Sequence, residues 1–235
     1  MATVPPSTTE SRLALVERFF SGTGDSYDFI VHATTLGADA RWKRRIVDAI
    51  PAHATRILDL ASGTGILTFA IAERFPQARV VGVELRDEYL QMARKRARER
   101  GLERVEFVLG RAEDYQAESG FDAIVSSYLA KYADLPVLSR NARQMLAPGG
   151  LVVMHDFTYP STPRTERYWR LQFAVIRPLM GTLFPSWRQA SDGLPDLIRQ
   201  TRWVPQLVEG LRAHGFDPVV EELSAHGATM VTARA

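Results

Sequence analysis

The sequence contains no cysteine, which excludes a disulfide framework, a thiolate metal site and a cysteine nucleophile and is compatible with a reducing cytoplasm. No run of about 18 uncharged apolar residues occurs, so no membrane-spanning helix is expected. The formal net charge is only +2, which by itself does not indicate a nucleic-acid partner, and none is expected. The five histidines show no i, i+4 ligand spacing, so no metal site is expected either.

The chain is long enough and apolar enough to form one sizeable hydrophobic core. Hydrophobic residues make up 46% of the 235 residues, and the chain has no repeat, low-complexity tract or long linker. The opening residues, MATVPPSTTE, lack the basic and apolar regions of a secretory signal and are interpreted as a loose tail. We therefore expect a single cytoplasmic domain over residues 1–235.

Short Val- and Ile-rich runs alternate with helix-like segments along most of the chain. The predicted strands are Ile57–Leu60, Arg79–Leu85, Val105–Gly110, Phe121–Ser127 and Gly150–Phe157. The predicted helices between them are Leu67–Arg74, Glu88–Arg100, a short Glu113–Ser119 and Leu135–Leu146. Such alternation predicts a parallel sheet with right-handed crossovers.

The two ends of the chain differ from this pattern. Helical segments at Glu10–Phe20 and Arg41–Ile50 precede the first strand. After an amphipathic helix at Pro205–His214, two strand-like runs flank a turn at His226–Gly227 and predict an antiparallel hairpin. The predicted fold class is therefore α/β, doubly wound, with a mainly parallel seven-stranded sheet that ends in a C-terminal antiparallel hairpin.

The stretch ILDLASGTG ends the first strand in a glycine-rich turn, where ligands bind in open parallel sheets. A dinucleotide fingerprint would need a third glycine where Thr68 stands, and no lysine follows Gly65 as a phosphate loop requires. Asp59 can instead brace the turn, and Glu84, at the end of the next strand, can accept both ribose hydroxyls of an adenosine. An acid pair without a phosphate cradle favours S-adenosylmethionine over a dinucleotide.

Five segments carry a resemblance to a known superfamily: ILDLASGTG, VVGVELRDEYLQMA, GRAEDY, FDAIVSSY and RQMLAPGGLVVMHDFTYP. Together they resemble a class I S-adenosylmethionine-dependent methyltransferase with its Rossmann-like fold. Within that superfamily, YDFIVHATTLGADARWKR and LPDLIRQ…LVEGLRAHGF resemble the ubiquinone/menaquinone C-methyltransferase family. The similarity runs from Tyr27 to the C-terminus.

The resemblance implies S-adenosylmethionine as cofactor and a set of residues that hold it. By position, Thr64 would hold the methionine part, Glu84 the ribose and Arg111–Ala112 the adenine edge, and Ser127 would face the methyl group or the carboxyl tail. The full cofactor-binding set is Asp59, Ala61, Gly63, Thr64, Gly65, Glu84, Leu85, Arg111, Ala112, Glu113 and Ser127.

The chain departs from the family at several positions. Arg111 stands where the family has Asp or Asn. Adenine recognition would therefore use backbone groups, the carboxylate of Glu113 or Asp114, or stacking of the Arg111 side chain. Ser62 stands where the family often has glycine. Residues 128–132 read YLAKY instead of Phe-Gly-Leu-Arg-Asn, and Asp39-Ala40 replaces His-Arg. The last two changes lie where an acceptor should bind.

For the methyl acceptor, the resemblance implies a small lipophilic or aromatic molecule such as a quinol or phenol. Asp156, at the end of the fifth strand, is the first candidate to face the acceptor, whereas His155 would point to the opposite face. Lys131 could stabilise an oxyanion where the family would use arginine. Candidate pocket residues are Tyr27, Trp42 and Tyr128.

Two alternatives remain open at this stage: methylation of another specialised metabolite at O, N or C, and binding of the cofactor without turnover. The N-terminal helices within 10–50 and the insertion 158–204 are predicted to form a substrate lid. Its apolar stretch Tyr168–Trp187 is interpreted either as a capping helix or as the wall of a lipophilic pocket. The basic run Arg86–Arg104 reads as a solvated helix face, with transient contact to an anionic membrane as the alternative. The oligomeric state is left open.

Overall fold

The computed structural model describes residues 8–118, 120–223 and 227–235. The helices among them are α1 (Thr9–Phe20), α2 (Gly24–Thr34), α3 (Ala38–Ala49), α4 (Ile66–Arg74), α5 (Asp87–Glu99), α6 (Leu135–Met145), α7 (Pro163–Leu183), the 3-10 turn η1 (Pro185–Trp187), α8 (Arg188–Gln200) and α9 (Trp203–Ala213). The strands are β1 (Arg56–Leu60), β2 (Arg79–Glu84), β3 (Val105–Leu109), β4 (Phe121–Ser127), β5 (Leu146–Phe157), β6 (Asp217–Leu223) and β7 (Ala228–Arg234).

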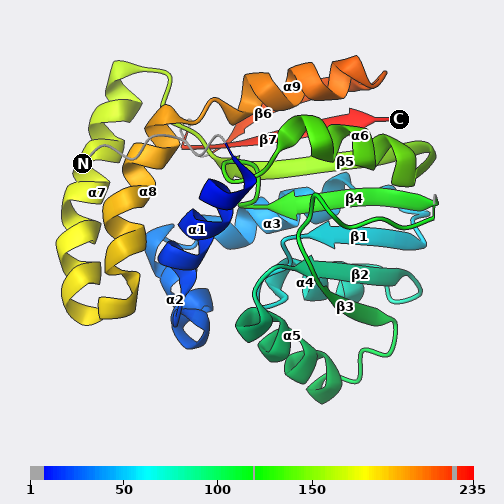
Figure 1. Ribbon diagram of the computed structural model, residues 1–235, viewed down its shortest axis with the longest axis horizontal. Helices are drawn as coiled ribbons and strands as arrows, with labels where there is room; N and C mark the ends of the chain where they lie inside the picture. The colour runs from blue at the N-terminus through cyan, green and yellow to red at the C-terminus, as the bar shows by residue number, and fades with distance from the viewer. Residues whose placement is uncertain (1–7, 119, 224–226) are drawn as a thin grey trace.

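These strands form one seven-stranded sheet in the order β3-β2-β1-β4-β5-β7-β6 (Figure 1). The first five strands are parallel, with Leu58 of β1 opposite Val81 of β2 and Ile124 of β4. Strand β7 runs antiparallel to both β5 and β6. The predicted fold class, including the C-terminal antiparallel hairpin, is confirmed.

Each face of the sheet packs against its own group of helices because successive strand residues point to opposite sides. On one face, Leu58 and Leu60 belong to a core completed by α6 and α9, with Trp203 of α9 only 1% exposed. On the other face, Ile57 packs with residues of α3 and α4, and Phe107 of β3 packs with α5. The doubly wound arrangement therefore follows from the alternation of apolar side chains.

A separate group of helices, α1, α2, α7 and α8 with η1, gathers at one end of the sheet, on the left in Figure 1. Their shared core includes Phe19 of α1, Ile30 of α2 and Leu197 of α8, together with Tyr132, which follows β4. Helix α7 follows β5, so this helical layer lies at the carboxyl end of the parallel strands, where ligands bind in such sheets. No helix among the described residues is both long enough and apolar enough to cross a membrane.

Local predictions differ from the structure at three places. The short helix predicted at Glu113–Ser119 was wrong, because residues 113–118 form no helix. Glu113 is instead tied to α6 and its N-cap: its carbonyl accepts the Asn141 side-chain amide at 2.7 Å, and its carboxylate accepts Asp134 N–H. Helix α2 was not predicted, and β5 begins at Leu146 instead of Gly150. In the predicted hairpin turn, Gly227 is a turn residue, and His226 lies outside the described residues.

Candidate active site

The turn after β1 has the tight geometry that its glycines predict. Three residues have positive φ: Ala61 at 60°, Gly63 at 58° and Gly65 at 91°. A Cβ on Gly65 would come within 2.6 Å of the Phe69 ring, whereas a Cβ on Gly63 would meet no atom within 4 Å. Position 65 therefore requires glycine, because a side chain would clash with Phe69 and the backbone angle disfavours other residues. At Gly63, just before α4, the backbone has space beside it that a ligand can approach.

Asp59 lies beneath this turn and is only 1% exposed. Its Oδ2 accepts a hydrogen bond from the Thr68 hydroxyl at 2.6 Å, and its Oδ1 has no partner among the described residues. Burial raises the pKa of Asp59 to about 7, with the nearby Glu84 adding to the shift and Thr68 and Lys43 opposing it. Its bond to Thr68 ties β1 to α4 across the turn.

Glu84 ends β2 beside the turn and is 6% exposed. Its two carboxylate oxygens accept backbone N–H groups, Oε2 from Gly63 and Oε1 from Arg86, each at 2.8 Å. Burial raises its pKa although these hydrogen bonds favour the charged form. Each oxygen can accept a further hydrogen bond, so Glu84 is placed to receive hydroxyl donors from a ligand at the turn.

A small cavity continues from the turn along the ends of β2 and β3. Its lining comprises Arg12, Leu13, Val16, Ala61, Val83, Leu85, Gly110, Arg111, Ala112, Glu113, Leu129 and Tyr132. Arg111 is paired with Glu113 at 3.6 Å and with Asp114 at 3.0 Å, so its guanidinium is held at the rim by acidic neighbours. The apolar walls from Leu85 and Ala112 suit a flat aromatic group.

Thr64, at the tip of the turn, is engaged by the N-terminal helices. Its hydroxyl donates to Asp28 Oδ1 of α2 at 2.5 Å, and Arg96 of α5 donates to the other oxygen of the same carboxylate at 2.6 Å. The turn that should hold the methionine part is therefore linked directly to α2.

On the acceptor side, Lys131 and Asp156 form a buried ion pair. Lys131 Nζ lies 2.5 Å from Asp156 Oδ1, with 3% and 0% of the two side chains exposed, and Lys131 N–H donates to Oδ2 at 3.0 Å. Burial lowers the pKa of Lys131, and Asp156 opposes that shift. The ammonium also lies 4.6 Å from the Tyr132 ring centre and 5.4 Å from that of Tyr128. The two predicted catalytic residues thus contact one another.

A second buried ion pair, Asp39 with Lys43, lies beside the first. The Tyr128 hydroxyl donates to Asp39 Oδ1 at 2.7 Å, and the Tyr128 ring stacks on that of Phe157 with 4.8 Å between ring centres. The backbone of Tyr128 has a positive φ of 71°. Sequence reasoning singled out Tyr128 and placed Asp39 where an acceptor should bind, but it missed Lys43 and the pairing of Asp39 with Lys43. Their i, i+4 spacing on a helix was the available signal.

His155 and Asp156 face different groups, as strand alternation predicts. His155 Nδ1 lies 3.0 Å from the Ser127 hydroxyl, and its ring packs 5.2 Å from that of Trp42. Burial, reinforced by Lys43 and Lys131, lowers the pKa of His155 well below its usual range, so the imidazole is neutral near pH 7. The hydroxyl of Ser127 is thereby engaged by a neutral histidine.

Aromatic rings from distant segments meet above these ion pairs. Tyr27 lies 5.1 Å from Tyr89 and 5.8 Å from Trp187, and Phe20 lies 5.9 Å from Tyr132. Of these rings, sequence analysis identified only Tyr27 as a pocket candidate and placed Trp187 only within the apolar insertion. The others carried no local signal, because they become neighbours only through the packing of the helical layer.

The residues at the strand ends fit S-adenosylmethionine. Gly63 leaves room for close approach, Glu84 offers acceptors for a ribose, and Leu85 and Ala112 line a small cavity on the side where an adenine would lie. The dinucleotide alternative fails here because the position of the third glycine is occupied by Thr68, which is hydrogen-bonded to Asp59. The fold and this site define the class of protein: a methyltransferase that uses S-adenosylmethionine.

Comparison with known proteins identifies the family. Residues 7–232 match the model of the ubiE/COQ5 methyltransferase family, and the chain belongs to that family. A demethylmenaquinone methyltransferase of Thermus thermophilus is 34% identical over 208 residues, which cover 87% of this chain and 94% of that protein. A ubiquinone/menaquinone biosynthesis C-methyltransferase of Dinoroseobacter shibae is 27% identical, over 89% of this chain and 86% of that protein.

A solved structure shares the fold. The geranyl diphosphate C-methyltransferase of Streptomyces coelicolor, determined with S-adenosyl-L-homocysteine, aligns with a TM-score of 0.64 at 14% identity. The alignment covers 99% of this chain and 86% of that one. At this identity the likeness concerns the fold alone.

Proposed function

We propose that this enzyme methylates a ring carbon of a reduced quinone that carries a lipophilic tail. The names of its relatives support such an acceptor, since the match to the demethylmenaquinone methyltransferase covers 87% of this chain. The observation that carries the proposal is the buried Lys131–Asp156 pair, which lies against the faces of Tyr128, Tyr132 and Phe157. A flat aromatic acceptor would find ring faces and a positive charge together at this place.

In this proposal Lys131 stabilises the oxygen of the acceptor ring. S-adenosylmethionine, when bound, supplies a methyl group already activated on a sulfonium. The acceptor hydroxyl would lose its proton, and the ortho carbon would gain the methyl group as the methyl–sulfur bond breaks and S-adenosyl-L-homocysteine is left. That carbon would then give up its own proton as the ring becomes aromatic and the oxygen is reprotonated, so one proton is released overall. The Lys131 ammonium donates to the developing oxyanion, and Asp156 holds the ammonium in place.

The two predicted lid segments are part of the proposal. Tyr132 beside Lys131 packs in one core with Leu15 of α1 and Trp187 of η1, so the ion pair lies beneath the helical layer. We assign α1, α2 and residues 158–204 the role of a lid, which opens for the acceptor and closes to exclude water. Helix α3, within the predicted range 10–50, instead packs in the core of the sheet.

The test compares Lys131→Met with a matched exposed substitution, Lys95→Met on α5, whose ammonium is 72% exposed at the side chain. With labelled S-adenosylmethionine and a short-tailed, water-soluble naphthoquinol, Lys131→Met should lower kcat by about 10²- to 10³-fold, because one donor to the oxyanion is lost. Cofactor affinity should stay unchanged. Lys95→Met should behave as the wild type.

Removal of Lys131 alone leaves Asp156 buried and unpaired, which can cost about 3–5 kcal/mol of stability. The double variant Lys131→Met/Asp156→Asn removes both charges and should recover stability without recovering activity. Wild-type turnover in a folded Lys131 variant would contradict the assigned role. A methyl ether instead of a C-methylated product would contradict the proposed reaction.

A further inference from the structure

Helix α7 carries an apolar stripe on its exposed side. Among the described residues, large apolar side chains that stand exposed are concentrated here: Tyr168, Leu171, Val175, Leu179 and Leu183 are each 53% to 64% exposed. They recur every three or four residues, which places them along one face of a helix. An exposed row of this length is unusual on a surface that faces only water.

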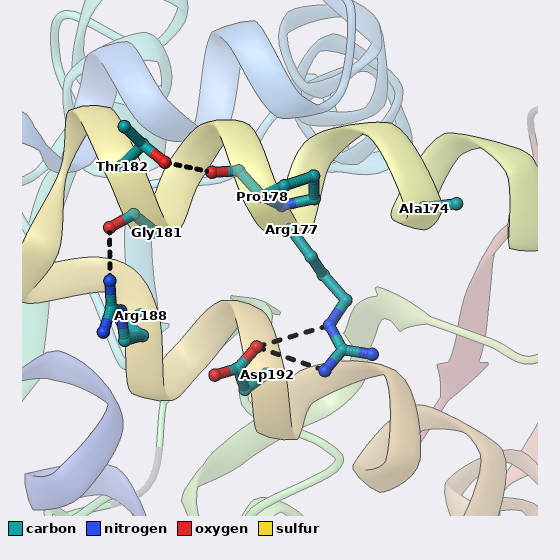
Figure 2. A pocket seen from close by; sticks show the side chains of 7 residues that line it. All are labelled: Ala174, Arg177, Pro178, Gly181, Thr182, Arg188 and Asp192. Carbon is teal, nitrogen blue, oxygen red and sulfur yellow. Dashed lines mark hydrogen bonds and ion pairs between the residues drawn. The ribbon is translucent and has the colours of Figure 1, made fainter.

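The opposite side of α7 fixes the helix to the protein. Trp169 and Met180 are buried, at 7% and 6% exposure. Figure 2 shows the hollow between α7 and α8, where Arg177 binds Asp192 at 3.2 Å and the Arg188 guanidinium donates to the carbonyl of Gly181 at 3.2 Å. The hollow is polar and internally paired, so it holds α7 in an orientation that presents the apolar stripe outward.

Unpaired positive charge accompanies the stripe. Arg164 and Arg167, in the first turns of α7, are exposed and form no ion pair among the described residues. Arg164 stands four residues before Tyr168 and therefore lies in line with the stripe. The one acidic residue of α7, Glu166, is already bonded to Arg170 at 2.5 Å and accepts the Tyr159 hydroxyl.

The apolar surface extends from α7 to α2. Phe29 of α2 is 61% exposed, and its ring lies 5.8 Å from that of Phe184. Gln172 of α7 donates to the carbonyl of Thr34 at 3.0 Å, which joins the two helices, and the nearby Leu36 is 73% exposed. The surface thus spans two helices of the layer that covers the candidate active site.

We propose that α7 docks in the plane of an anionic phospholipid bilayer, with the stripe at the acyl boundary and Arg164 and Arg167 at headgroup phosphates. An amphipathic helix with apolar residues on one side and arginines at its margin has the chemistry that such a surface binds. The choice of a bilayer rests on the proposed function, because a lipid-tailed acceptor resides there and this layer covers its site. Helix α5, where the sequence suggested membrane contact, lies on another side of the molecule (Figure 1) and has no exposed large apolar side chain, since its apolar Leu90 and Ala93 are buried.

The test is co-sedimentation of the full chain with phosphatidylcholine vesicles that contain or lack phosphatidylglycerol. The wild type should bind the anionic vesicles, and binding should weaken as salt is raised. The triple variant Leu171→Ser/Val175→Ser/Leu179→Ser should bind at least about tenfold more weakly. Arg164→Gln/Arg167→Gln should lose the preference for phosphatidylglycerol. Val219→Ser/Val220→Ser, at exposed apolar positions of β6, is the matched control and should bind as the wild type does.

The triple variant should bind S-adenosylmethionine as the wild type does, because no residue of α7 lines the cavity beside the glycine turn. The naphthoquinol assay of the Lys131 variants contains no vesicles, so failure of the docking proposal is distinguishable from failure of the proposed reaction. Equal binding of the triple variant and the wild type, or no binding by either, would overturn the proposal. A dimer in analytical ultracentrifugation that the triple variant dissociates would also overturn it, since the stripe would then be covered by a second copy.

Discussion

Glu84 shows how one side chain can serve both the fold and the ligand. Its carboxylate fixes the glycine turn through Gly63 N–H and the start of α5 through Arg86 N–H. It remains beside the cavity, with lone pairs that a ribose can use. Loss of the side chain should therefore affect cofactor binding more strongly than folding, because the backbone donors it leaves lie near the open cleft.

We expect Glu84→Ala to weaken binding of S-adenosylmethionine by roughly 2 kcal/mol, about 30-fold in Kd, because hydrogen bonds to a charged acceptor are lost. Isothermal titration calorimetry measures the change. Glu106→Ala on β3 is the control, since that carboxylate forms only an exposed ion pair with Arg79. If the Glu84 variant binds the cofactor as tightly as the wild type, the ribose assignment is wrong.

The elements that surround the site differ in how they are held. Helix α1 crosses the cofactor cavity and is fastened by Arg12 to Asp134 at 2.9 Å and by Glu17 to Arg86 at 2.5 Å. Both bonds involve partly exposed side chains, which are worth little individually. By contrast, α6 and α9 are packed into the core of the sheet. The helical layer should open more easily than the rest.

Hydrogen exchange should show this difference. Amides of α1, α2, α7 and α8 should exchange faster than those of α6 and α9 in the free protein, and should slow when S-adenosylmethionine and a short-tailed naphthoquinol are both bound. Mass spectrometry of peptides from 9–34 and 163–200 gives the measurement. If the amides of these peptides exchange as slowly as those of the β-strands in the free protein, the helical layer is part of the rigid core.

At the scale of the whole molecule, the buried carboxyl of Asp59 couples folding to pH. Its folded pKa of about 7 exceeds the usual value of 3.8, so the native state binds the proton more tightly than the unfolded chain does. The resulting stability is fully present below about pH 4 and is lost as pH rises through about 7. A shift of this size corresponds to about 4 kcal/mol.

Asp59→Asn should remove this dependence, because the amide can still accept from Thr68 but cannot ionise. Urea unfolding at several pH values should show the variant gaining stability relative to the wild type between about pH 4 and 7. Asp122→Asn is the control: hydrogen bonds from Thr55 and Arg56 outweigh burial and lower the Asp122 pKa, so its effect on stability falls below about pH 4 and its difference from the wild type should stay constant between about pH 4 and 7. A constant difference between Asp59→Asn and the wild type across this range would contradict the assignment.

The sequence by itself determined the positions of the strands along the chain, the mainly parallel sheet with its C-terminal hairpin, the glycine turn and the acid at the end of β2. These features are local: apolar alternation sets which strand residues are buried, and the positive φ values near Gly63 and Gly65 restrict the turn within a few residues. The candidate cofactor residues could be proposed for the same reason, since they lie at or just after strand ends whose positions the pattern fixes, and their roles stay predictions. Short segments without such a pattern, including α2 and residues 113–118, were predicted wrongly or missed.

Only the tertiary structure decided which side chains meet on the acceptor side. Asp156 contacts Lys131 across 25 residues of sequence, Thr64 contacts Asp28 across 36, and Tyr128 contacts Asp39 across 89. The sequence pattern identifies a residue as apolar or charged but not its partner, because partners are set by which strands and helices become neighbours in space. The pairing of Asp156 with Lys131 follows from the adjacency of β4 and β5, and the outward orientation of the α7 stripe follows from the packing of the helical layer.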